Sequence, residues 1–251
     1  MLDIMKSEFY KVRKSKVTFV TALCLLGISA IEIAAFLYGR FAGGLWGDML
    51  SDTKGVEIYA GFTIGNFYLI FVALFVGGMI SNEYTNRTVR QVVSRGASRV
   101  QIALGQFISL ATAMTVITIV PAALASLTAS LCWEFGNVSL QKFLLVVLGQ
   151  LVVIWSYAAI TMLIAHLTRS GGLSIGINIM LLLGGAVAAQ LLVLLTKKDF
   201  FMEYWIENIQ QNALNPGGDT GTQVKCIIIL TIIGVVFTVL GIVRFKIKDV
   251  D

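Results

Sequence analysis

Long uncharged apolar runs recur from one end of this chain to the other, and they constrain its fold more than any other feature. A helix that crosses a bilayer needs about 20 mostly apolar residues. Only 13% of the 251 residues are charged, whereas soluble domains are about one quarter charged. We therefore expect an all-α integral membrane protein in which residues 1–251 form one transmembrane domain. The six predicted spans cover residues 17–38, 60–80, 100–127, 143–167, 173–195 and 226–243.

The basic residues are distributed unevenly between the two sides of this predicted bundle. With six spans both termini share one side, and thirteen of the nineteen Lys and Arg residues fall there. Because Lys and Arg near span ends are retained in the cytoplasm, we expect cytoplasmic N and C termini. Residues 1–16, which include Lys6, Phe9 and Tyr10, are predicted to form an amphipathic helical segment on the same side.

Two local features refine the spans. Pro121 removes a backbone donor inside the third run, so we expect a kink there and consider a split span as an alternative. Aromatic and apolar residues between Phe200 and Ile209 follow a helical spacing, which suits a helix lying on the outer membrane surface or one packing on the outer ends of the spans. Residues 215–218, with the sequence NPGG, should end that helix.

The loop between the second and third spans is more organised than a passive linker. Val89, Val92 and Val93 fall at i, i+3 and i+4 and predict a short amphipathic helix along the inner membrane surface. Glu83 precedes Arg87 by four residues, a spacing that allows an ion pair. Gly96 should end the short helix, and Ser98 with Gln101 predicts a capping box at the start of the third span.

On these residues the chain resembles the type-two ATP-binding-cassette (ABC) permease family. In that family a span ends in Glu and is followed by a Thr-Arg-like element, a short coupling helix and a Ser-Arg pair before the next span. The corresponding features here are Glu83, Arg87 with Thr88, a coupling helix at about 87–95 centred on Val89 to Ser94, and Ser98 with Arg99. The six spans and the basic tail from Arg244 to Asp249 fit the same layout.

The resemblance implies the fold of a type-two ABC exporter and a mechanism with several partners. Two permease chains, as a homodimer or heterodimer, would associate in the bilayer, and two separate ATPase subunits would dock on their cytoplasmic loops. The chain contains no Gly-Lys pair and hence no phosphate-binding loop of its own, so it is not expected to be an enzyme or to bind a cofactor directly; ATP and Mg would sit on the partner ATPase. The residues expected to couple to the ATPase are Glu83, Arg87, Thr88, Arg90, Val92, Val93 and Arg99.

Within the family, the short chain and its MKSEFYKVRKSK start are similar to permeases for bacteriocins and lantibiotics. This resemblance implies export of an amphipathic antimicrobial peptide, or self-immunity against one, across the plasma membrane of a Gram-positive bacterium. The same layout also leaves open an ABC permease for lipid, polysaccharide, drug or sodium export.

A few polar and small residues inside the spans are candidates for the transport pathway or a subunit interface. Glu32 is the ionisable residue deep in a span, where it must face protein or water, although a structural hydrogen bond would explain it equally. Asn66 is a second polar candidate, and Gly172 and Gly176 give the fifth span a small-residue surface for close packing. Further polar residues expected to bond between helices are Gln106, Gln150, Asn178 and Gln190.

Other functional classes find less support in the sequence. The three Cys residues and His166, the single histidine, show no ligand spacing, so we predict no metal site and interpret His166 as a packing residue. An intramembrane protease would need paired carboxylates with histidines, and nucleic acid is not an expected partner. An ion-coupled transporter, which should show broken helices or several buried charges, and a membrane sensor remain the alternatives from outside the ABC class.

Overall fold

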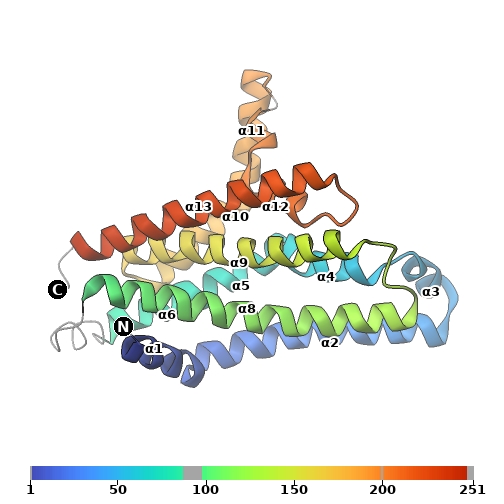
Figure 1. Ribbon diagram of the computed structural model, residues 1–251, viewed down its shortest axis with the longest axis horizontal. Helices are drawn as coiled ribbons and strands as arrows, with labels where there is room; N and C mark the ends of the chain where they lie inside the picture. The colour runs from blue at the N-terminus through green and yellow to red at the C-terminus, as the bar shows by residue number, and fades with distance from the viewer. Residues whose placement is uncertain (1, 87–97, 199, 248–251) are drawn as a thin grey trace.

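The computed structural model describes residues 2–86, 98–198 and 200–247 of the chain. These residues form helices, with one isolated backbone bridge between Lys54 and Glu134 and no strand within the described ranges. Figure 1 shows the long helices running side by side, with the start of the first helix and the end of the last at the same end of the bundle. We call this the termini end. Which face of a membrane it occupies stays a prediction.

Six helices are long and apolar enough to cross a membrane, which confirms the predicted number of spans for the described part of the chain. Five of them begin and end within a few residues of the predicted bounds because a long apolar run and its charged flanks are local properties of the sequence. The six are α2 (Lys16–Ala42), the segment Tyr68–Thr85, α8 (Arg99–Cys132), α9 (Leu140–Thr168), α10 (Gly171–Thr196) and α13 (Thr220–Ile247), and the exception is Tyr68–Thr85.

The second predicted span is not one continuous helix over 60–80. The chain forms α4 (Gly55–Ile64), leaves helical geometry at Gly65 with φ −79° and ψ 146°, and continues through α5 (Asn66–Val72), a π-helical turn η1 (Ala73–Gly77) and α6 (Gly78–Thr85). Polar side chains from other helices offset the backbone bonds lost at this break. Gln210 donates to the carbonyls of Thr63, at 2.5 Å, and Ile64, at 3.3 Å, so those groups are not left unpaired.

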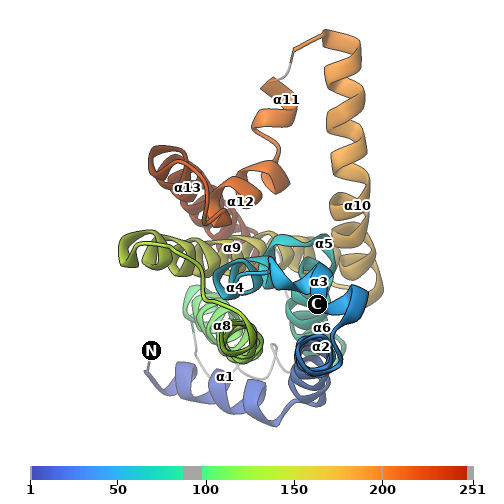
Figure 2. The ribbon, with the colours of Figure 1, turned by 90° about the vertical axis from the view of Figure 1, so that its right-hand side faces the viewer.

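Helix α1 (Leu2–Lys14) confirms the expected N-terminal helix and packs on the first turns of α8 and α2. Figure 2, which looks along the bundle, shows α1 lying across the direction of the spans. Its buried face includes Glu8 and Val12, whereas Tyr10 is 65% exposed. A helix with one polar, exposed face and one packed face suits the position of a membrane surface.

Helix α10 stands away from the rest of the bundle over much of its length (Figures 1 and 2). Large apolar side chains on it, including Met180, Leu194 and Leu195, are exposed. The chain returns through α11 (Phe200–Glu203) and α12 (Ile206–Leu214). The helix expected over residues 200–209 is thus two short helices. Residues of α12 such as Ile209 and Leu214 are buried, so α12 packs on the bundle, as the second of the two alternatives expected.

The remaining local predictions had mixed outcomes. Helix α8 runs through Pro121 without a break, so the split-span alternative is wrong. Ser98 precedes the first residue of α8, but its side chain accepts no capping hydrogen bond, so the predicted capping box is wrong. The first loop carries a short helix, α3 (Gly44–Ser51), that the sequence patterns did not indicate.

Candidate functional site

The candidate site lies at the termini end, where α6, α9 and α13 finish and α8 begins (Figure 1). The connection from Asn86 to Ser98 joins α6 to α8 at this end. The predicted coupling helix at 87–95, and with it Arg87, Thr88, Arg90, Val92 and Val93, lies outside the described residues. The structure therefore describes the helix ends beside that connection.

A buried ionic cluster fastens α1 to the bundle. The Nζ of Lys11 lies 2.6 Å from Oε1 of Glu8 and 3.2 Å from Oε1 of Glu83, at the end of α6. The side-chain amide of Gln106, on α8, donates to the second oxygen of Glu83. We call these four residues the α1 clamp. Because Glu8 is only 3% exposed, its carboxylate is stabilised by the ammonium group of Lys11 rather than by bulk water.

The helices approach closely at the α1 clamp. A Cβ atom at Gly105 would lie 3.4 Å from Ile4 and 3.5 Å from Glu8. These are ordinary van der Waals distances, so an alanine would fit at Gly105 and would contact both side chains. Helices α1 and α8 are therefore in direct contact at the α1 clamp.

The electrostatics of the α1 clamp are unbalanced, with two carboxylates around one ammonium group. Burial, followed by the nearby carboxylate of Glu83, raises the pKa of Glu8 to about 7. Burial alone would lower the pKa of Lys11, but the carboxylates of Glu83 and Glu8 outweigh it, and the pKa of Lys11 is raised. Lys11 thus keeps its charge at neutral pH, whereas Glu8 holds its proton to a higher pH than an ordinary glutamate does.

A second cluster joins α6, α9 and α13 at the same end. The hydroxyl of Tyr84 and Nδ1 of His166 are 2.8 Å apart, and the His166 ring stacks on Phe245 with centroids 4.9 Å apart. The guanidinium carbon of Arg169 lies 5.8 Å from the centre of the Tyr84 ring, a cation–π contact. We call these four residues the aromatic cluster. His166 is 2% exposed, as expected for a packing residue.

Arg99 makes the third link, between the beginning of α8 and the end of α13. Its Nη1 donates to the backbone carbonyl of Lys246 at 3.2 Å. Of the residues expected to contact an ATPase, the structure thus describes two, Glu83 and Arg99, and both hold helices together at the termini end. Glu83 binds Lys11 and Gln106; its predicted pairing with Arg87 falls outside the described residues.

Glu32 lies about two thirds along α2, beside the break in the second span. It lines a small cavity of about 140 Å³ together with Gly61, Gly65 and Tyr68. One carboxylate oxygen of Glu32 is buried and has no hydrogen-bond partner among the described residues. The prediction that Glu32 faces protein or water rather than lipid is consistent with this position.

The other membrane candidates lie on α5 and α10. Asn66 is the first residue of α5. Gly172 and Gly176 lie in the first turns of α10, and a Cβ atom at either would meet nothing within 4 Å, so they do not serve close packing within the described chain. Gly77 does serve close packing, because a Cβ atom there would lie 3.2 Å from the hydroxyl of Ser174 on α10.

Sequence reasoning identified some of the polar links between helices. Gln150 donates to Thr63 Oγ1 at 3.3 Å, and Thr161 donates to Asn178 at 3.1 Å, as expected for hydrogen bonds between spans. Lys11 and Tyr84 were not identified, because nothing in their local sequence shows which distant carboxylate or imidazole they reach.

Comparison with known proteins gives a family without a described activity. No curated protein matches the chain. The family described as "Protein of unknown function (DUF2705)" matches residues 18–250, which include the six helices long and apolar enough to cross a membrane, apart from the first two residues of α2, but not α1 with Glu8 and Lys11. Since the match extends over nearly the whole sequence, the chain belongs to the DUF2705 family.

Proposed function

We propose that this chain is the permease subunit of an ATP-driven ABC exporter that moves an amphipathic substrate, most simply an antimicrobial peptide such as a lantibiotic, out of or away from the plasma membrane of a Gram-positive bacterium. The observation that supports this most is the joining of five helices at the termini end. The α1 clamp links α1, α6 and α8, and the aromatic cluster links α6, α9 and α13. A push on the connection between α6 and α8 would thus reach most of the bundle.

In the proposed mechanism the energy comes from separate chains. Two ATPase subunits, which hold ATP and Mg, dock on the 87–95 segments of two permease chains. Closure of the ATPase pair moves the end of α6, and Glu83 transmits this movement to α1 through Lys11 and to α8 through Gln106. The transport pathway between the two permease chains then switches between access from the two sides of the membrane.

The second permease chain would pack on α10 in this proposal. Helix α10 stands apart from the bundle, and its exposed apolar side chains and open glycines Gly172 and Gly176 leave room for close approach of another helix. The resulting dimer would enclose a pathway between two copies, suited to a substrate that is itself amphipathic.

The test is co-purification from native membranes in mild detergent, followed by mass spectrometry and an ATPase assay. We expect a nucleotide-binding subunit and ATPase activity to accompany the tagged chain. Charge reversal at Arg87 or Arg90 should reduce ATPase binding or transport, while Lys14→Glu, which changes an exposed charge on α1, should not. Repeated recovery of a lone, inactive chain would contradict the proposal.

One observation favours a second candidate, an ion-coupled transporter. The second span is broken at Gly65, and Glu32 lines the small cavity at the break. Broken helices beside an ionisable residue are typical of ion-coupled sites. Transport in proteoliposomes that follows a sodium or proton gradient without ATP, and that is lost in Glu32→Gln, would favour this candidate over the exporter.

A further inference from the structure

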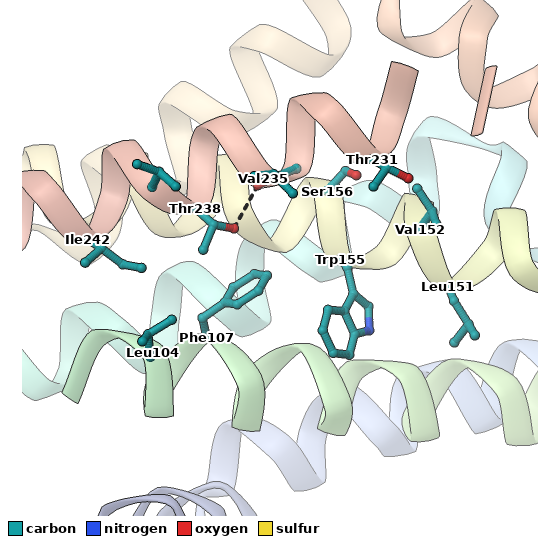
Figure 3. A pocket seen from close by; sticks show the side chains of 12 residues that line it. Leu104, Phe107, Leu151, Val152, Trp155, Ser156, Thr231, Val235, Thr238 and Ile242 are labelled. Carbon is teal, nitrogen blue, oxygen red and sulfur yellow. Dashed lines mark hydrogen bonds between the residues drawn. The ribbon is translucent and has the colours of Figure 1, made fainter. Parts of the chain in front are cut away.

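A long apolar groove runs between α8 and α13, with α9 as its floor (Figure 3). Its volume is about 420 Å³. All three helices line it, among their residues Leu104 and Phe107 of α8, Trp155 of α9, and Val235, Val239 and Ile242 of α13. The groove is independent of the α1 clamp and of the aromatic cluster.

Specific contacts set the distances between the three helices that form the groove. Gly234 brings α13 close to α9, because a Cβ atom there would lie 2.8 Å from the hydroxyl of Ser156. On the other wall, the Trp155 indole donates to Thr115 of α8 at 3.1 Å and its ring meets Phe107 edge-on at 5.8 Å. Helix α13 therefore packs closely against α9, whereas the side chain of Trp155 lies between α9 and α8.

The hydroxyl groups of the lining are already satisfied by the protein. Thr238 donates to the carbonyl of Gly234 at 2.8 Å, the dashed line in Figure 3, and Thr231 donates to Ile227 in the same way. Ser156 donates to the carbonyl of Leu230 at 2.8 Å. A hydrocarbon chain in the groove would thus leave none of these donors without an acceptor, and would cover apolar surface.

Basic groups stand where the groove reaches the termini end. Val235, Val239, Ile242 and Lys246 follow one another at four, three and four residues along α13, so Lys246 continues the face that lines the groove. The guanidinium group of Arg99 is fixed beside it by its bond to the Lys246 carbonyl. Two cations thus lie at the mouth of an apolar groove, an arrangement complementary to an anionic headgroup with a hydrocarbon tail.

The length of the groove matches one leaflet of a bilayer. Eleven residues separate Thr231 from Ile242, which corresponds to about 17 Å along a helix. Half of the hydrocarbon core measures about 15 Å. With the phosphate at the level of Lys246 and the acyl chain beginning near Ile242, the chain would therefore end close to the middle of the membrane, beside Thr231.

We propose that the groove between α8 and α13 binds one acyl chain of an anionic phospholipid from the surrounding membrane, with its phosphate held at Arg99 and Lys246. This inference requires that the spans lie in a bilayer but does not depend on the transport function proposed above. The lipid would fill the space between α8 and α13, so that the movement of one helix is transmitted to the other.

Native mass spectrometry of the protein released from mixed phosphatidylcholine and phosphatidylglycerol vesicles tests the proposal. We expect retained phosphatidylglycerol on the wild-type protein and about fivefold weaker retention in Lys246→Gln, the loss expected for one basic group near the surface. Lys14→Gln removes an exposed charge elsewhere at the termini end and should retain the lipid. Equal retention of both lipids, or no effect of Lys246→Gln, would overturn the proposal.

A second pair of variants tests the groove itself. Val239→Trp should fill it and displace the lipid, whereas Val236→Trp adds the same bulk to an exposed face of α13 outside the groove and should not. If Val239→Trp instead changes the mass of the oligomer, the occupant is a second copy of the chain and the lipid proposal is wrong.

Fluorescence locates the chain within the groove. Phosphatidylglycerol brominated on its tails should quench the Trp155 emission, measured as the difference between the wild-type protein and Trp155→Phe in the same vesicles. Brominated phosphatidylcholine should quench this emission less at equal content. Equal quenching by the two lipids would show that Trp155 meets only bulk membrane.

Discussion

The Nζ of Lys11 lies 3.2 Å from Oε1 of Glu83, although 72 residues separate them in the sequence. Lys11 belongs to α1 and Glu83 to α6, so this one contact fixes the N-terminal helix to the end of the second span. Gln106 extends the contact to α8 by binding the other oxygen of Glu83. The position of α1 therefore depends on the helix that leads into the predicted coupling segment.

Replacing Lys11 with Met should destabilise the protein. The change removes the ammonium group and leaves the carboxylates of Glu8 and Glu83 together in a mostly buried site, a loss of about 1–3 kcal/mol for an unpaired buried group. Thermal unfolding in detergent should show a lower midpoint than for the wild type. Lys14→Met, on the exposed face of the same helix, serves as the control, and equal midpoints for the two variants would contradict the role of the α1 clamp.

Stability should fall between pH 4.5 and pH 7. Burial, and then Glu83, raise the pKa of Glu8 from an ordinary 4.5 to about 7, so the folded protein binds a proton that the unfolded chain has already released in this range. Folding is then favoured most below pH 4.5, and this contribution is lost as the pH rises toward 7. Lys11, whose pKa is raised above an already high value, stays charged throughout and adds no slope.

Glu8→Gln isolates this effect because an amide does not titrate. The variant should lose the part of the pH dependence that lies between 4.5 and 7, as measured by thermal unfolding at a series of pH values. Asp3→Asn, a substitution of an exposed acid on the same helix, should leave the slope unchanged. An identical slope in Glu8→Gln and the wild type would show that another group is responsible.

Tyr84→Phe should loosen the link between α6 and α9. The substitution keeps the ring but removes the hydroxyl 2.8 Å from Nδ1 of His166, which is buried and would lose that partner. We expect a cost of about 1–3 kcal/mol and faster hydrogen exchange at the end of α6. Tyr10→Phe, at an exposed position of α1, is the matched control. Unchanged exchange in Tyr84→Phe would mean that ring packing alone holds these helices.

The spans could be predicted from the sequence because their cause is local. A run of about 20 apolar residues has to be helical in a bilayer, whatever surrounds it. The sequence also identified Glu83 as a functional candidate and Gln106 as a residue that bonds between helices, but proximity in sequence suggested Arg87 as the partner of Glu83. Arg87 lies outside the described residues, and the partner of Glu83 that the structure describes on α1, Lys11, lies 72 residues away, so no local pattern indicates it.

The break at Gly65 could not be predicted for the same reason. Residues 60–80 contain no charged residue, and glycine is tolerated in a membrane helix. The side chains that stabilise the break are distant in sequence. The amide of Gln150 lies 87 residues from its acceptor Thr63, and that of Gln210 lies 147 residues from Thr63. A local pattern contains no information about either.

Replacing Gln210 tests how the broken second span is stabilised. Gln210 is completely buried and its amide reaches the carbonyls at the end of α4, whereas its neighbour Gln211 is exposed. Gln210→Leu should leave these carbonyls without that donor and lower the thermal midpoint, at a cost of about 1–3 kcal/mol, while Gln211→Leu should change it little. Similar midpoints for both leucine variants would show that packing, rather than the Gln210 amide, stabilises the break.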